Sequence, residues 1–234
     1  MTGRMKGITA RIGEWTDGPG RPPAPACAPE EAELLRETSR LKAECRREAR
    51  ARLERLTGAQ KAASDERITE FLLSSAWFRE ARSVFLYLSV GREPDTAQIL
   101  KRALAEGKTV LAPRCGERPF MKAVRVSSAD ALRPGAFGIP EPPDGPDEGA
   151  QADLVIMPCL AVDREGWRLG HGGGYYDAFL SQHPARSVCL CHAALLLDRL
   201  PHDARDVRPD ACILSDGWLY PQNGGPDTKQ KSNP

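Results

Sequence analysis

Hydrophobic residues recur at helical spacing in several parts of the chain. The longest stretch lies near the start, where Leu34, Leu41 and Leu53 belong to an apolar stripe that returns every third or fourth position. It ends at a Thr-Gly-Ala-Gln junction, in which Thr57 suits the N-cap of a second helix. Thr96 is expected to cap a later one. The spacing predicts helices over residues 30–56, 59–75, 97–106 and 175–182.

Short apolar runs separate these helices. Residues 83–90 (Ser-Val-Phe-Leu-Tyr-Leu-Ser-Val) are rich in residues that favour strands, and residues 153–160 form a continuous apolar run typical of a buried strand. Further strands are predicted over residues 109–113, 121–126, 187–196 and 211–215. Because strands and helices alternate, the sequence predicts an α/β fold with a mainly parallel sheet covered on both faces.

The two ends of the chain differ from its middle. Residues 1–30 are rich in Gly, Pro and Ala, a composition that cannot bury a core, so we expect a disordered N-terminal extension. Residues 221–234 are polar and are expected to form a disordered tail. A length of 234 residues then leaves a single domain over residues 31–220.

Composition excludes some classes of protein. A formal net charge of +1 gives no general basis for binding nucleic acid or acidic membranes. No apolar run approaches the roughly 18 residues of a membrane helix, and the first residues lack the apolar stretch of a secretory signal. An organellar targeting segment stays open, because residues 1–13 carry Arg and Lys but no acid. The 7 cysteines show no Cys-x-x-Cys spacing, which favours reduced thiols and a cytoplasmic location.

The candidate chemistry centres on a glycine-rich stretch, Arg168-Leu-Gly-His-Gly-Gly-Gly-Tyr-Tyr-Asp177. A predicted strand precedes it and a predicted helix follows, so its glycines would bring free backbone amides close to an anion. Arg168 adds a planar cation suited to phosphate, and Asp177 adds an oxygen ligand suited to Mg²⁺. Most glycine clusters are only turns, and this stretch lacks the Gly-Lys-Ser/Thr that ends a P-loop. The arginine, the consecutive glycines and the Tyr-Tyr-Asp together favour a nucleotide polyphosphate with its metal.

Other polar residues have two interpretations from sequence alone. Lys42 and Arg46 stand four residues apart and share a helix face, but several arginines surround them, which favours a solvated basic face. Glu93 follows a strand at the edge where ligands sit in open sheets, although a lone loop glutamate is usually solvated. The run Cys189-x-Cys191-His192 has soft-metal ligands but no second pair to complete a tetrahedral set. Asp163 is expected to hold a turn near residues 165–166.

The glycine-rich stretch closely resembles the signature of the 5-formyltetrahydrofolate cyclo-ligase family, and the resemblance extends over residues 38–216. It implies a single three-layer Rossmann-like domain. It also implies that Lys42 and Arg46 contact ATP, that Glu93 contacts the folate, and that Asp206 joins Asp177 at Mg²⁺. His171 departs from the pattern, since the family more often has Tyr or a basic residue there, and Ala178 stands where Arg is common.

The resemblance therefore implies a set of site residues that should converge on one pocket. Arg168 and Lys42 are expected to be catalytic. Leu88, Glu93, Met121 and Tyr176 are expected at the folate, although core packing explains Leu88 and Met121 equally well. The expected ATP ligands are Lys42, Arg46, Arg168, Leu169, Gly170, His171, Gly172, Gly173, Gly174, Tyr175 and Tyr176.

The implied reaction converts 5-formyltetrahydrofolate and MgATP into 5,10-methenyltetrahydrofolate, ADP and phosphate. The formyl oxygen would attack the γ-phosphate, and N10 would then close the ring. We expect a monomer that binds neither nucleic acid nor membrane. Two alternatives stay open: an enzyme on a similar scaffold that acts on sugar phosphates without ATP, and a non-catalytic relative that binds a nucleotide or RNA. The second is disfavoured, since the chain is not strongly basic.

Overall fold

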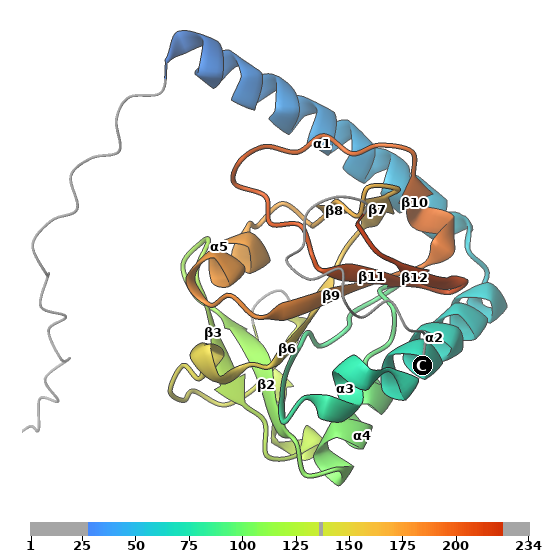
Figure 1. The fold of residues 1–234 in the computed structure, drawn as a ribbon, viewed down its shortest axis with the longest axis vertical. Coiled ribbons are helices and arrows are strands. Elements are labelled where there is room, and N and C mark those ends of the chain that lie inside the picture. Colours follow the sequence, from blue (N-terminus) through green and yellow to red (C-terminus); the bar gives the residue numbers. More distant parts are fainter. Residues whose placement is uncertain (1–27, 136–137, 222–234) are drawn as a thin grey trace, which may run out of the picture.

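A seven-stranded sheet forms the centre of the computed structural model, which describes residues 28–135 and 138–221 (Figure 1). Its strand order is β12-β11-β9-β6-β1-β2-β3, and the five inner strands are parallel, whereas β3 and β12 run antiparallel at the edges. The predicted α/β fold with a mainly parallel sheet is confirmed. The strands are β1 Ser83–Leu86, β2 Thr109–Cys115, β3 Met121–Arg125, β6 Leu154–Pro158, β9 Arg186–Cys191, β11 Ala211–Leu214 and β12 Gly217–Leu219.

Helices cover both faces of this sheet, as its alternating apolar side chains require. One face packs against Ile68 and Leu72 of α2, Phe78 of α3 and Ile99 of α4. The other packs against Phe179 of α5 and against a small sheet of order β10-β7-β8. The helices are α1 Pro29–Arg55, α2 Gly58–Ser74, α3 Ala76–Glu80, α4 Ala97–Ala105 and α5 Tyr175–Gln182, and the small sheet contains β7 Ala161–Asp163, β8 Arg168–Leu169 and β10 Leu196–Leu197.

Helix α1 lies along the outside of the molecule, and its first half extends beyond the body (Figure 1). Its second half is anchored where Ala49, fully buried, packs with Leu160, Leu169 and Leu200. Thr57 then starts α2 with the expected cap, because its side chain accepts from the Gln60 amide and the Gln60 side chain accepts from the Thr57 amide. No helix within residues 28–135 and 138–221 is long and apolar enough to cross a membrane.

Several element boundaries differ from the prediction. Strand β1 ends at Leu86, not at residue 90, because the amides of Ser89 and Val90 bond to side chains of their own loop. The strand predicted over residues 187–196 ends at Cys191 and continues into a 3₁₀ turn. Helix α3 and strand β12 were not predicted. The two segments expected to be disordered fall outside the described residues, except for residues 28–30 and 221.

Thr96 is the N-cap residue of α4, as predicted, but its side chain makes no capping hydrogen bond. Its hydroxyl donates to the Tyr87 carbonyl and accepts from the Ser89 amide, so it braces the loop after β1 instead. Asp95 takes the capping role, since its carboxylate accepts from the Ala97 amide at 2.9 Å. This loop, together with the loops after β6 and β9, lies at the carboxyl edge of the parallel strands, where open α/β sheets bind their ligands.

Candidate active site

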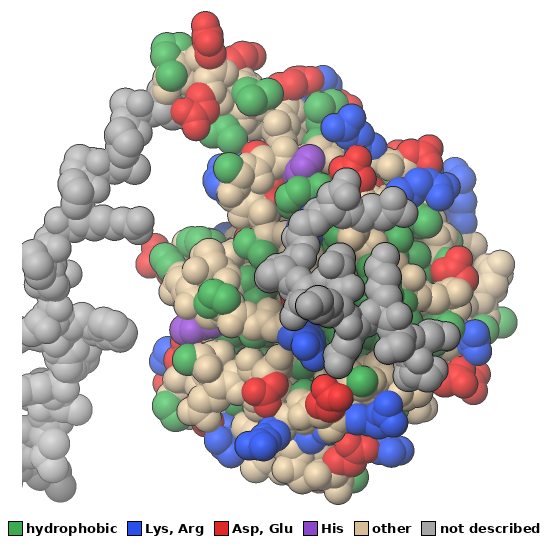
Figure 2. Space-filling model, in the orientation of Figure 1, with side chains coloured by type: hydrophobic (Ala, Val, Ile, Leu, Met, Phe, Trp, Pro, Cys, Tyr) green, Lys and Arg blue, Asp and Glu red, His purple; other side chains and the backbone are tan. Residues whose placement is uncertain are grey.

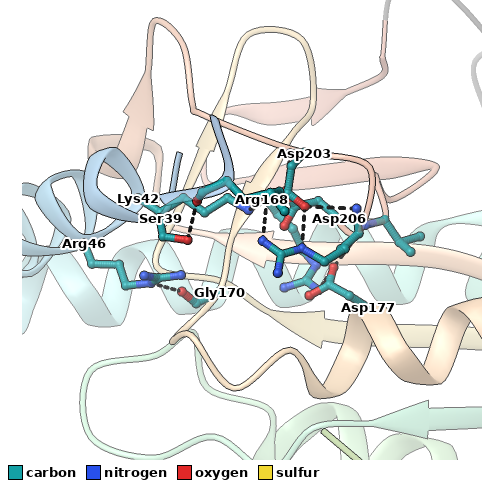
Figure 3. Close-up of polar contacts among 11 residues, drawn as sticks. Ser39, Lys42, Arg46, Arg168, Gly170, Asp177, Asp203 and Asp206 are labelled. Carbon is teal, nitrogen blue, oxygen red and sulfur yellow. Dashed lines mark hydrogen bonds and ion pairs between the residues drawn. The ribbon is translucent and has the colours of Figure 1, made fainter. Parts of the chain in front are cut away.

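Two cations of α1 reach the carboxyl edge of the sheet. Arg46 donates through Nε to the Gly170 carbonyl at 2.9 Å (Figure 3). Its guanidinium also packs against Gly172, since a Cβ added to that glycine would lie only 3.4 Å from the guanidinium carbon. One turn earlier, the Lys42 Nζ lies 2.9 Å from Asp203 Oδ2 and 2.5 Å from Asp206 Oδ2. The helical spacing thus turns both cations toward the glycine-rich loop. They are part-buried and engaged there, which rules out the interpretation of this pair as a purely solvated basic face.

The glycine-rich loop joins β8 to α5. Gly172 and Gly174 have φ values of 102° and 72°, a backbone region that side chains disfavour. Gly174 is the N-cap of α5, and it has no side chain with which to satisfy the first amides of the helix. The loop therefore presents the positive end of a helix dipole beside the guanidinium of Arg46. This arrangement is suited to binding an anion.

Arg168 enters the same region from β8, and its side chain is only 5% exposed. Its Nη2 lies 2.8 Å from Asp177 Oδ1, and its guanidinium carbon lies 5.9 Å from the centre of the Tyr176 ring. Within the described part of the chain, Arg168 Nε and the Tyr176 hydroxyl are buried without a hydrogen-bond partner. Buried polar groups are nearly always paired, so these two groups, on neighbouring side chains, are candidates for contact with a polar ligand.

Two carboxylates flank these cations. Asp177 uses Oδ1 for both Arg168 and the Val207 amide, while Asp206 uses Oδ2 for both Lys42 and the Asp203 amide. The contact to Val207 ties α5 to the loop that carries Asp206, so the two acids approach the site together (Figure 3). Lys42, Arg46, Arg168, Asp177 and Asp206 therefore converge on the glycine-rich loop, as the sequence predicted.

Comparison with known proteins identifies the family of the chain. Residues 38–215 match the sequence profile of the 5-formyltetrahydrofolate cyclo-ligase family. The chain belongs to this family. A probable 5-formyltetrahydrofolate cyclo-ligase of Caenorhabditis elegans is 32% identical over 189 residues, covering 74% of this chain and 92% of the relative. The mouse 5-formyltetrahydrofolate cyclo-ligase is 27% identical over 187 residues, covering 73% and 92%.

A solved structure gives the same result for the fold. The 5,10-methenyltetrahydrofolate synthetase of Aquifex aeolicus superimposes with a TM-score of 0.69 at 28% identity, covering 82% of this chain and 98% of that one. The cyclo-ligase resemblance inferred from the glycine-rich stretch is confirmed, and so is the three-layer α/β fold. Sugar-phosphate isomerisation and RNA binding are not favoured.

The loop expected to contact folate meets the glycine-rich loop directly. Glu93 Oε1 lies 3.0 Å from His171 Nε2, and Glu93 Oε2 accepts from the Val90 amide at 2.9 Å. Both residues line a cavity of about 100 Å³, together with Cys159 and Leu160. The two loops expected to contact the folate and ATP are thus neighbours, and His171 bridges them.

The other residues predicted at the folate lie deeper. Leu88 packs in the core cluster of β1 and α4, and Met121 packs in the cluster that adjoins Tyr175 and Tyr176. Core packing accounts for Leu88, whereas Met121 lies next to the predicted site. Asp163 is fully buried and accepts from the amides of residues 165, 167 and 200, so it holds the turn as expected. Within the described residues, no three His, Cys, Asp or Glu side chains form a metal-binding group.

Sequence reasoning missed Asp203. Its side chain accepts from Lys42 and from two side-chain nitrogens of Arg205, at 2.8 and 3.0 Å, while its amide donates to Asp206. Asp203 thus contacts both Lys42, the predicted cation, and Asp206, the predicted metal ligand. No spacing distinguishes it from the other aspartates of its loop, so the sequence held no signal for it.

The Asp203 carboxylate should shape the acid stability of this cyclo-ligase. The Arg205 guanidinium, and then the Lys42 ammonium, hold the pKa of Asp203 well below its ordinary value despite burial. The unfolded chain protonates this group near pH 3.9, so its contribution is present above about pH 4 and is lost as the pH falls further. Thermal melts between about pH 5 and pH 2 should show a shallower decline for Asp203→Asn than for wild type. An identical decline would contradict this account.

Proposed function

We propose that this chain catalyses the ATP-dependent cyclisation of 5-formyltetrahydrofolate to 5,10-methenyltetrahydrofolate, releasing ADP and phosphate. The observation that carries the proposal is the gathering of Lys42, Arg46 and Arg168 around the glycine-rich loop, with Asp177 and Asp206 beside them. No nucleophilic side chain is needed for such a reaction, because phosphoryl transfer depends mainly on positioning and charge neutralisation.

The phosphates of ATP would lie along the loop from Gly170 to Gly174. The amides at the start of α5 would donate to them, and Arg46 would approach from the opposite side. Burial and the neighbouring Arg50 lower the pKa of Arg46, but an arginine stays charged at neutral pH. Arg168 and Lys42 would neutralise the transferring phosphoryl group, and are therefore the catalytic residues. Leu169, His171, Tyr175 and Tyr176 complete the proposed nucleotide site.

The residues present fit a magnesium ion. Mg²⁺ binds through one or two carboxylates plus substrate phosphates and water, and Asp177 and Asp206 supply two. Each carboxylate uses one oxygen for its cation and an amide, which leaves Asp177 Oδ2 and Asp206 Oδ1 without a hydrogen bond among the described residues. When bound, the ion would neutralise the negative charge on the phosphate oxygens.

The folate would occupy the side of the loop that faces Glu93. Tyr176 is buried, and burial raises the pKa of its hydroxyl well above the ordinary value, so the hydroxyl stays protonated. It would donate to an oxygen of the substrate, next to the unpartnered Nε of Arg168. Glu93 would orient the folate ring, with Leu88 and Met121 supporting it from the core.

The proposed chemistry then follows from these positions. The formyl oxygen attacks the γ-phosphorus and ADP leaves, while Arg168 and Lys42 hold the transferring group. N10 of the folate then bonds to the formyl carbon and loses its proton, and the ring is completed as phosphate leaves that carbon. What the chain contributes is alignment of the formyl oxygen with the phosphorus atom and stabilisation of charge that develops during transfer.

We also propose a monomeric protein of the cytoplasm that binds neither nucleic acid nor membrane. The near-neutral charge supports this, and so does the face in Figure 2, on which acidic and basic side chains are interspersed. The cysteines of the described residues are free, which fits a reducing compartment.

The decisive test is a direct assay. The protein is mixed with 5-formyltetrahydrofolate and MgATP, and absorbance is followed at the methenyl-folate band. We expect a rise that depends on ATP and on Mg²⁺. No rise with the folded protein at saturating substrates would reject the function, and a parallel binding assay of ATP against sugar phosphates would then test the sugar-phosphate alternative.

A further inference from the structure

A buried histidine links three separate parts of the chain behind the predicted folate site. His192 follows β9 and is only 1% exposed. Its Nδ1 lies 2.6 Å from the Ser64 hydroxyl of α2, and its Nε2 lies 3.1 Å from the carbonyl oxygen of Arg92. The reaction proposed above gives this side chain no role.

The partners of His192 fix its hydrogen positions. A carbonyl oxygen only accepts, so Nε2 must carry the proton and donate to Arg92. Nδ1 is then a lone-pair acceptor, and Ser64 donates to it. Burial lowers the pKa of His192 below its ordinary value, and the nearby charges of Asp65 and Lys61 act in opposite directions, so the ring is neutral at pH 7.

The carbonyl that His192 holds belongs to the residue just before Glu93. The Arg92 side chain in turn donates to the carbonyls of Leu53 and Leu56, where α1 ends. His192 itself lines the same cavity as Glu93 and His171. The backbone next to Glu93 is thus fixed between the end of the helix that carries Lys42 and a buried imidazole.

The rest of the loop has its own anchors. The Tyr87 hydroxyl donates to the Pro94 carbonyl at 2.7 Å, and the Asp65 carboxylate accepts from the Asp95 amide at 3.2 Å. Loss of the contact to Arg92 would therefore shift the backbone beside Glu93 without releasing the whole loop. Such a contact affects where a side chain points more than whether the protein folds.

We propose that His192, held by Ser64, is a positioning residue that sets Glu93 in place for the folate substrate. This inference rests on the proposed function. It assigns His192 no contact with either substrate, so its effect should appear in the KM for the folate. The KM for ATP should change much less, because Lys42 and Arg46 are held by other contacts.

The test compares three variants in the steady-state assay with 5-formyltetrahydrofolate and MgATP. His192→Leu removes both hydrogen bonds and should raise the folate KM about tenfold, the size of one hydrogen bond to the folate that is lost when Glu93 is displaced. His192→Gln keeps an N–H near the position of Nε2 and should stay within about threefold of wild type. Ser64→Ala removes the donor to Nδ1 and should raise the folate KM by a few-fold. In each variant kcat and the KM for ATP should change less than about twofold.

His183→Leu is the matched control, because this histidine follows α5 and its ring packs at a tilt against Phe179. It should leave the folate KM unchanged. The inference is overturned if His192→Leu leaves the folate KM unchanged, if both KM values rise together, or if Gln is no better than Leu. Should the leucine variant not fold, a wild-type folate KM in Ser64→Ala overturns it instead. A wild-type protein without turnover rejects the proposed function itself.

Discussion

Replacing Arg168 with alanine is expected to lower kcat/KM for MgATP by about 100-fold or more. Loss of a single preorganised group that stabilises transition-state charge typically has this effect. The side chain is nearly fully buried, is aligned by Asp177, and keeps its Nε free of other partners in the described structure. Initial rates at the methenyl-folate band, with circular dichroism to verify folding, would measure the loss.

Two further variants make this prediction specific. Arg168→Lys keeps the charge but not the planar donor pair, so its activity should fall between those of wild type and alanine. Arg186→Ala is the control. This exposed arginine begins β9, at the end of the strand away from the site, and lies over Trp77. It should have no effect. An Arg168→Ala enzyme within about threefold of wild type would remove Arg168 from the catalytic residues.

The glycine-rich site was predictable because its determinants are local. A strand, a loop of small residues and a helix start follow one another in the chain, and positive φ values at Gly172 and Gly174 need residues without a Cβ. The fold was predictable for a similar reason, because buried parallel strands appear as continuous apolar runs. The predicted strand end and the expected side-chain cap of α4 were in error where loop side chains bond to the backbone of the same loop, as Thr96 does to the Ser89 amide.

The rest of the site depends on contacts between distant residues. Glu93 and His171 are 78 positions apart, and Ser64 and His192 are 128 apart. No periodicity reports such a pairing. Helical spacing showed that Lys42 and Arg46 share a face, but only the resemblance indicated what that face meets. Neither the spacing of residues nor the family resemblance indicated Asp203, because its importance comes from its ion pair with Lys42.

Helix α1 carries Lys42, the residue for which we expect the second large loss of activity. Replacing Lys42 with methionine is expected to lower kcat/KM for MgATP by about 100-fold, mainly through a higher KM for ATP. Methionine keeps most of the apolar length of the lysine, so packing should survive while the charge is lost. Without the ammonium, Asp203 and Asp206 would also repel the phosphates. Steady-state rates at varied ATP, with magnesium in constant excess, would measure this change.

Arg47→Met is the matched control for that experiment. It removes one positive charge from the same helix, one residue beyond Arg46, but Arg47 is exposed and lies on a different face. If the basic residues of α1 acted only through their summed charge, the two variants would lose activity equally. If Lys42 binds phosphate, as proposed above, only Lys42→Met should lose activity. Equal losses would mean that α1 contributes a general positive field, and Lys42 would then no longer count as a ligand of ATP.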